Sequence, residues 1–68
     1  MSKFTLKTAR VNAGFTQKEA AKELNVSNKT LGRWEKGETL PKPKQIPLLC
    51  ALYDLSYDDI IFFNPKNA

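Results

Sequence analysis

The sequence predicts one small all-α domain built from five short helices. Three of the helix starts share a pattern: an apolar residue precedes a hydroxyl residue, and another apolar residue follows four positions after the hydroxyl. The hydroxyl can cap the first turn of a helix, and the apolar pair can pack across that turn. Glycine occurs only 3 times in 68 residues, and no strong alternation of apolar and polar side chains is present. Both observations argue against a β domain.

The first two helices have clear boundaries. The first is expected from Phe4 to Asn12, because Gly14 can take the left-handed conformation in which helices often end. The second is expected from Gln17 to Leu24. Thr16 and Glu19 have the spacing of a capping box, in which each side chain bonds the backbone N–H of the other residue.

A tight turn leads into the third helix, expected from Asn28 to Lys36 and closed by Gly37. The turn residue Asn25 is one of the few non-glycine residues that tolerate a positive φ. The small side chains of Ala20 and Ala21 allow the second and third helices to cross closely. The sequence therefore predicts a rigid helix-turn-helix pair.

Two further helices are expected after a proline-rich connection. The fourth runs roughly from Lys44 to Tyr53, and its start lies as late as Ile46 if Pro47 is to fall in the first turn, where proline is tolerated. The fifth is expected from about Tyr57 to Phe62, with Ser56 as its cap. Residues 1–63 then form the domain, and residues 64–68 form a short flexible tail.

Charge and composition narrow the class of function. Eleven Lys and Arg against seven Asp and Glu give a formal charge of +4, which favours a polyanionic partner. Cys50 is the single cysteine, so no disulfide can form within the chain, and a cytoplasmic location fits. No apolar run is long enough to cross a membrane, and no signal peptide is recognisable.

Catalysis has little support in this sequence, and we expect a protein that is not an enzyme. Histidine is absent, and a single cysteine cannot form a zinc site. The glycines form neither a phosphate-binding loop nor a dinucleotide-binding motif. We expect no cofactor, no metal ion and no small-molecule ligand.

The third helix carries the most informative pattern. At about 100° per residue, its polar and basic positions share one face, while Leu31 and Trp34 lie on the opposite side and anchor the helix. The residues on the polar face are Asn28, Lys29, Gly32, Arg33 and Lys36. Amide and guanidinium groups are the ones that read base edges in the major groove of DNA. A solvated basic face is the alternative for these positions.

Gly32 lies in the middle of this face and has two interpretations. Glycine in a helix interior costs about 1 kcal/mol relative to alanine. That cost is understandable if a partner surface approaches closely at this position. Alternatively, the glycine is merely tolerated.

Residues 16–37 resemble the helix-turn-helix of the Cro and repressor proteins of lambdoid phages and of the wider XRE-type regulator family. The matching positions are Thr16, Gln17, Ala20, Ala21, Leu24, Val26, Leu31, Trp34 and the closing Glu35-Lys36-Gly37. Asn25 stands where the family usually has glycine. The resemblance extends to Leu6 and Arg10 and to residues 47–56, and it implies a lambda-repressor-like fold.

The resemblance also implies roles for individual residues. Base-reading positions would be Asn28, Lys29, Gly32 and Arg33. Contacts to the DNA backbone would come from Gln17, Ser27, Lys36, Lys42 and Lys44. Arg10 and Glu35 would form a structural ion pair between the first and third helices.

One recognition helix reads few bases, so we expect a homodimer on a near-palindromic operator. The expected dimer surface is the apolar C-terminal region, consisting of Leu55, Ile60, Ile61, Phe62 and Phe63. The same residues could instead complete the core of a monomer, and pairing could occur only on DNA.

The sequence thus predicts a sequence-specific regulator of transcription that binds double-stranded DNA in the cytoplasm. An antitoxin or a restriction-control protein could use the same fold to repress its own promoter. A protein-interaction module that has lost DNA binding is a different class. The polar face of the third helix carries no acidic residue, which favours DNA.

Overall fold

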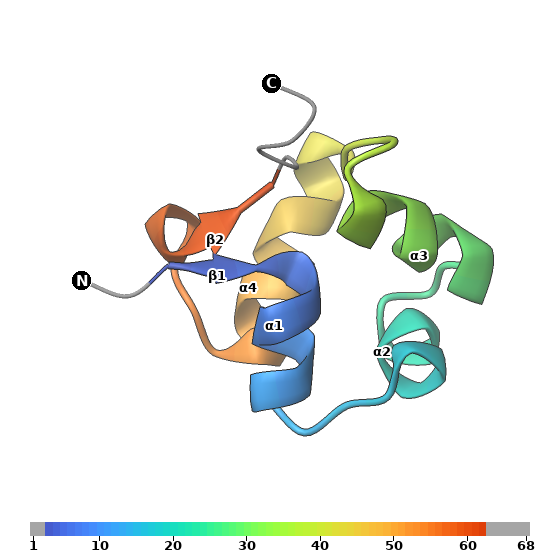
Figure 1. The fold of residues 1–68 in the computed structure, drawn as a ribbon, viewed down its shortest axis with the longest axis horizontal. Helices are drawn as coiled ribbons and strands as arrows, with labels where there is room; N and C mark the ends of the chain where they lie inside the picture. The colour runs from blue at the N-terminus through green and yellow to red at the C-terminus, as the bar shows by residue number, and fades with distance from the viewer. Residues whose placement is uncertain (1–2, 63–68) are drawn as a thin grey trace.

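The computed structural model describes residues 3–62, and most of them are helical. Figure 1 shows α2 and α3 on one side of the molecule and a small pair of strands on the other. Within the described residues the elements, in chain order, are β1 (Phe4–Thr5), α1 (Leu6–Asn12), α2 (Gln17–Glu23), α3 (Asn28–Lys36), the 3-10 turn η1 (Pro43–Gln45), α4 (Ile46–Tyr53), the 3-10 turn η2 (Tyr57–Asp59) and β2 (Ile60–Ile61).

The expectation of a fifth helix was wrong, because the structure has four α-helices in its described part. In place of a helix from Tyr57 to Phe62, one 3-10 turn leads directly into β2. Ile60 is already extended, with φ −113° and ψ 134°. Branched residues such as isoleucine fit an extended strand well, and here a partner strand is available.

That partner is β1, which also corrects the start of the first helix. β1 and β2 run parallel, with Phe4 opposite Ile60 and Thr5 opposite Ile61. Helix α1 therefore begins only at Leu6, and the Thr5 hydroxyl caps it by accepting a hydrogen bond from the N–H of Thr8 at 3.1 Å. The domain is mostly helical, with one short strand pair that joins the two ends of the described chain.

The bounds expected for the third helix are confirmed, and the second helix begins at Gln17 as expected but ends at Glu23, with Leu24 as its C-cap. Glu19 N donates to Thr16 Oγ1 at 3.1 Å, and Thr16 N donates to Glu19 Oε1 at 2.9 Å, so the capping box is present. Gly14, Asn25 and Gly37 have positive φ values of 88°, 59° and 79°. The left-handed conformation of these three residues lets the chain turn away at the ends of α1, α2 and α3.

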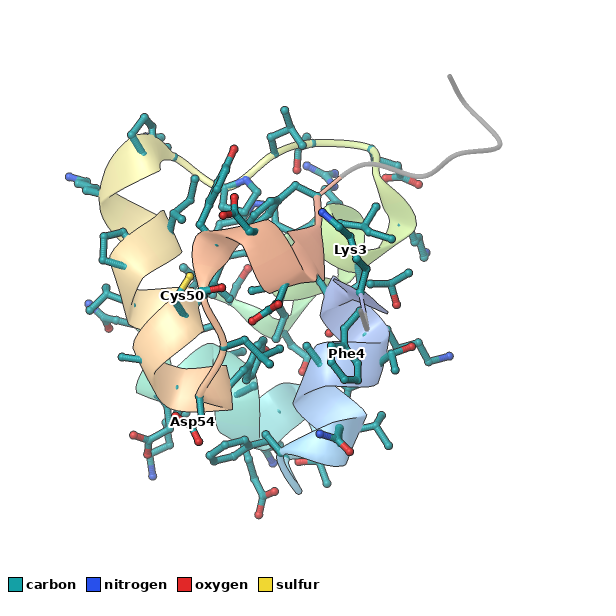
Figure 2. All side chains as sticks on the ribbon, turned by 90° about the vertical axis from the view of Figure 1, so that its left-hand side faces the viewer. Lys3, Phe4, Cys50 and Asp54 are labelled. Carbon is teal, nitrogen blue, oxygen red and sulfur yellow. The ribbon has the colours of Figure 1, made fainter. Side chains whose placement is uncertain are left out.

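The structure places the start of α4 at Ile46, directly after η1, with Pro47 in the first turn. The helix ends at Tyr53, and its C-cap Asp54 takes the left-handed conformation with φ 55°. Figure 2 shows Asp54 at the end of this helix and Cys50 nearer to its middle. Cys50 is partly buried, and desolvation, with a smaller contribution from the Asp59 carboxylate, raises the pKa of its thiol.

The core lies where α1, α3 and α4 meet and where α2 crosses α3. Ala20 and Ala21 are buried, so the second and third helices approach closely as the sequence predicted. Leu31 and Trp34 anchor α3 in this core, with exposed fractions of 0% and 6%. The other buried hydrophobic residues are Leu6, Ala9, Leu24, Leu49, Tyr53 and Ile60.

The apolar residues near the C-terminus belong largely to this core. Ile60 is 6% exposed, and Leu55 and Phe62 pack against the core while remaining partly buried. Ile61 is also partly buried. Phe63 and the tail expected at residues 64–68 lie outside the described residues. Ile60 is therefore not an available dimer contact, because its side chain is already covered within one chain.

Replacing Ile60 tests this correction. We expect Ile60→Ala to lower the free energy of unfolding by about 2–4 kcal/mol, the usual cost of a cavity left by a large aliphatic side chain. Urea unfolding at two protein concentrations measures this loss, which should not depend on concentration. Ile61→Ala is the matched control and should cost less. Normal monomer stability combined with lost self-association would contradict a core role for Ile60.

Candidate nucleic-acid interface

A buried ion pair joins the first helix to the third. Arg10 Nε lies 2.7 Å from Glu35 Oε2, and Arg10 Nη2 lies 3.5 Å from Glu35 Oε1. Arg10 Nη1 also donates to the carbonyl oxygen of Phe15 at 2.9 Å. Arg10 is only 8% exposed. One guanidinium group therefore holds α1, the connection to α2, and α3 in a fixed arrangement.

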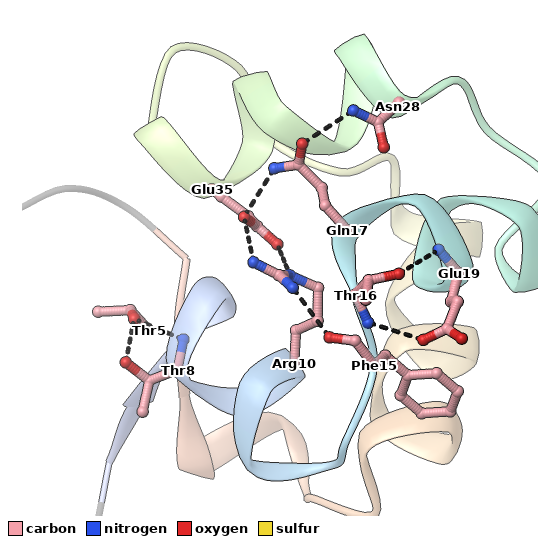
Figure 3. A network of polar contacts seen from close by, with 9 residues as sticks. All are labelled: Thr5, Thr8, Arg10, Phe15, Thr16, Gln17, Glu19, Asn28 and Glu35. Atoms are coloured by element: carbon pink, nitrogen blue, oxygen red, sulfur yellow. Dashed lines mark hydrogen bonds and ion pairs between the residues drawn. The ribbon is translucent and has the colours of Figure 1, made fainter.

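The polar network continues from this ion pair to the protein surface, as Figure 3 shows. Gln17, the first residue of α2, donates from Nε2 to Glu35 Oε1 at 3.0 Å. Its Oε1 accepts a hydrogen bond from Asn28 Nδ2 at 2.9 Å. Asn28 is the first residue of α3 and is exposed. Residues of three helices are thus connected by four side chains.

The outward face of α3 contains the residues expected to read bases. The side chains of Asn28, Lys29 and Arg33 are exposed, on the side opposite Leu31 and Trp34. The N-terminus of α3 is capped by Ser27, whose Oγ accepts from Thr30 N at 3.0 Å. The cap and the buried anchors hold the helix while its polar face stays open to solvent.

A hollow open to solvent lies along this face. The residues lining it are Gln17, Asn28, Lys29, Gly32, Arg33, Lys36 and Glu38. Most of the residues expected to contact DNA are therefore brought together in space. Glu38 was missed by the sequence analysis, because it follows the helix-ending glycine and its direction depends on the left-handed turn there.

A second hollow adjoins the ion pair. It is lined by Lys7, Arg10, Thr16, Gln17, Gly32, Glu35 and Lys36. Lys7 was also missed, although it precedes Arg10 by three positions and hence lies on the same helix face. This lysine adds a cation beside the start of α2.

Gly32 lies between the two hollows. A Cβ atom added there would have Gln17 Nε2 as its nearest neighbour at 3.6 Å, which is an ordinary contact distance. The packing of this chain therefore does not require glycine at the position. Close approach of a partner at Gly32 stays a prediction.

Three of the expected backbone contacts line neither hollow, and they are Ser27, Lys42 and Lys44. Lys42 directly precedes η1, and Lys44 lies within it. Both side chains are exposed, on the segment that follows α3. Neither residue lines the two hollows described above.

Tyr53 is an aromatic residue of the core that also carries a polar hydroxyl. It is 3% exposed, and its hydroxyl has no hydrogen-bond partner among residues 3–62. Its pKa is raised to about 12, mainly by desolvation and secondly by the Glu35 carboxylate, while the Arg10 guanidinium acts in the opposite direction. The phenol therefore stays neutral beside the buried ion pair.

The exposed polar face of α3, its apolar anchors and its close crossing with α2 define a DNA-binding domain of the helix-turn-helix class. A family model described as helix-turn-helix matches residues 6–60. The chain belongs to this family, in its XRE-type branch that includes Cro and repressor proteins.

One curated relative supports the same family assignment. The chain is 41% identical, over 56 residues, to the HTH-type transcriptional regulator ImmR of Bacillus subtilis (strain 168). The matched region covers 82% of this chain and 44% of the relative, so the chain spans less than half the length of that protein.

The family is one of DNA-binding transcription regulators rather than enzymes. Residues 3–62 contain no group of three or more His, Cys, Asp or Glu side chains placed to hold a metal ion. No helix in the described part of the chain is long and apolar enough to cross a membrane.

The ion pair gives a sharp stability prediction. Arg10→Met or Glu35→Leu alone should each lower the free energy of unfolding by about 3–5 kcal/mol, because each strands a buried charge. The double variant should lose less than the sum, and less than the worse single variant. Urea unfolding of the four proteins forms the double-mutant cycle, and additive losses would show that the two charges act independently.

Tyr53→Phe tests the unpaired hydroxyl. At neutral pH we expect equal or higher stability, by up to about 1 kcal/mol, because a buried group without a partner is removed. The native pKa of about 12 exceeds the ordinary value near 10, so the stability linked to Tyr53 is complete below pH 10 and is lost as the pH rises toward 12.

Thermal unfolding of both proteins between pH 8 and 12 measures this difference. All other titratable groups are common to the two proteins, so the loss specific to the wild type reports Tyr53. Parallel curves for the two proteins would refute the assignment.

Proposed function

We propose that this chain binds one near-palindromic operator in double-stranded DNA as a homodimer and regulates transcription there, in the manner of a phage Cro or repressor protein. The observation that carries the proposal is the polar face of α3, where Asn28, Lys29 and Arg33 are exposed together opposite Leu31 and Trp34. Such a regulator would act in the cytoplasm.

In this proposal α3 enters the major groove. Arg33 and Lys29 offer donors for guanine O6 and N7, and Asn28 offers an amide edge that matches adenine. At Gly32 the absence of a side chain would let the helix backbone come close to the bases. Discrimination by each bidentate pair amounts to about 1–3 kcal/mol.

Contacts to phosphates position the domain without selecting sequence. Basic side chains that neutralise phosphates release counterions, which gives binding a strong salt dependence. The residues proposed for this role are Gln17, Ser27, Lys36, Lys42 and Lys44. Gln17 already uses one N–H of its amide for Glu35, so its contribution would come from its remaining N–H or from the backbone at the start of α2.

Dimer formation follows from the size of the reading surface. One helix contacts only a few base pairs, whereas two copies on half-sites about one helical turn apart double the recognised sequence. Ile60 is buried and cannot contribute to a dimer contact. The apolar residues of this region that stay partly exposed are Leu55, Ile61 and Phe62. A small surface of this kind suits pairing on the operator.

Selection from a randomised duplex pool tests the function as a whole. We expect an enriched near-palindrome, bound far more tightly than scrambled DNA at physiological salt. Equal binding to all duplexes, lost together as salt rises, would show a merely electrostatic surface and would favour the protein-interaction module instead.

Two variants separate base reading from backbone contact on the selected operator. Arg33→Ala should weaken specific binding by about 1–3 kcal/mol and relax the preference at one base pair. Lys42→Ala should weaken all sequences alike and reduce the salt slope by about one. Titrations against operator and scrambled duplexes at several salt concentrations measure both effects. The same pattern from both variants would contradict the assignment of Arg33.

A further inference from the structure

Glu38 places a carboxylate on the surface proposed to face DNA. The hollow along α3 is lined by Glu38 together with amide and basic residues, which include Lys29 and Arg33. We propose that Glu38 is a repulsive element of this surface, whose carboxylate meets the sugar-phosphate backbone and lowers the affinity for DNA of every sequence. The inference rests on the proposed function, because it assumes that the outward face of α3 meets DNA.

The end of α3 fixes where Glu38 lies. Gly37 has φ 79° and ψ 13°, and beyond this left-handed turn Glu38 N donates to the carbonyl oxygen of Arg33 at 3.0 Å. Gly37 N donates to the carbonyl oxygen of Trp34 at 3.2 Å. These two hydrogen bonds form a Schellman motif. The backbone of Glu38 is therefore held against the last turn of the helix, while its side chain is exposed.

The place of Glu38 along α3 points to the DNA backbone rather than to the bases. In a helix-turn-helix complex the N-terminal residues of the recognition helix contact base edges. Asn28 begins α3 and Lys36 ends it, so the two lie about 12 Å apart along the helix axis. The major groove is itself about 12 Å wide. When Asn28 reads a base, Glu38 therefore reaches the edge of the groove, where the phosphates lie.

A carboxylate at this edge opposes binding. An ionised carboxylate only accepts hydrogen bonds, and phosphate oxygens are acceptors as well, so the two groups cannot bond each other. Their like charges repel. In the free protein the same carboxylate offsets the repulsion among the cations of the hollow. The net effect of Glu38 therefore changes from favourable to unfavourable when DNA arrives.

A penalty that applies to every sequence favours the operator at a given protein concentration. Non-specific complexes are held by phosphate contacts alone. A moderate loss of affinity empties these weak complexes first, whereas base contacts still hold the operator complex. Repulsive contacts contribute to specificity in this way. Glu38 thus makes occupancy of DNA depend on the base contacts of α3.

Glu38→Gln tests this role, because it removes the charge and keeps the length of the side chain. At about 50 mM salt we expect the affinity for the selected operator and for a scrambled duplex to rise about three- to tenfold, with base preferences unchanged. The gain should fade as salt rises, since screening shortens the range of the repulsion. Fluorescence anisotropy titrations of both duplexes at several salt concentrations measure these changes.

Glu23→Gln is the matched control. Glu23 is an exposed glutamate at the end of α2, and it lines neither of the two hollows beside α3. Both variants gain the same net charge, so an effect that depends on the place of Glu38 appears as the difference between them. Circular dichroism and thermal unfolding verify that both variants fold.

Equal gains from the two variants, or no gain from Glu38→Gln, would overturn the inference while the proposed function stands. A loss of affinity confined to operators with one particular C·G pair would instead make Glu38 a reader of the cytosine N4 amino group. A loss on all duplexes would make it a support for a neighbouring cation, and either loss overturns the repulsive role. If selection yields no operator, the proposed function fails, and the gain on scrambled DNA still reports Glu38 separately.

Discussion

Arg10 brings a positive charge into the interior of a very small domain, and Glu35 is the group that neutralises it. The contact of 2.7 Å spans 25 positions of sequence and joins α1 to α3, while a second bond from the same guanidinium holds the backbone at Phe15. Because a core of this size supplies only a few kcal/mol of net stability, the position of α3 depends on this pair being complete.

The same carboxylate connects stability to the proposed recognition of DNA. Glu35 accepts from Arg10 on the buried side and from Gln17 toward the surface, and Gln17 in turn holds Asn28. A side chain on the outward face of α3 is therefore held by hydrogen bonds that lead back to the buried ion pair. Preorganisation of this kind favours specificity, because the ordering cost is met during folding rather than during association.

The helix-turn-helix itself could be predicted closely, because its signals are local. Its capping residues, its left-handed turn residues and the apolar residues that anchor each helix all lie within a few positions of each other. The start of α1 was missed although Phe4, Thr5 and Ala9 repeat the pattern that marked the other helices. The strand at Ile60 could not be recognised, since its partner lies 56 positions earlier. Likewise, the engagement of Gln17 depends on three helices meeting, and no local pattern encodes it.

We propose that the outward face of α3 is the surface that reads DNA. The most direct measurement is an NMR titration of the 15N-labelled chain with its selected operator and with a scrambled duplex of equal length. We expect the operator to cause the largest changes in the amide and side-chain signals of Asn28, Lys29 and Arg33, and the scrambled duplex to perturb mainly lysines. Changes centred on Leu48 or Tyr57, with α3 unaffected, would contradict it.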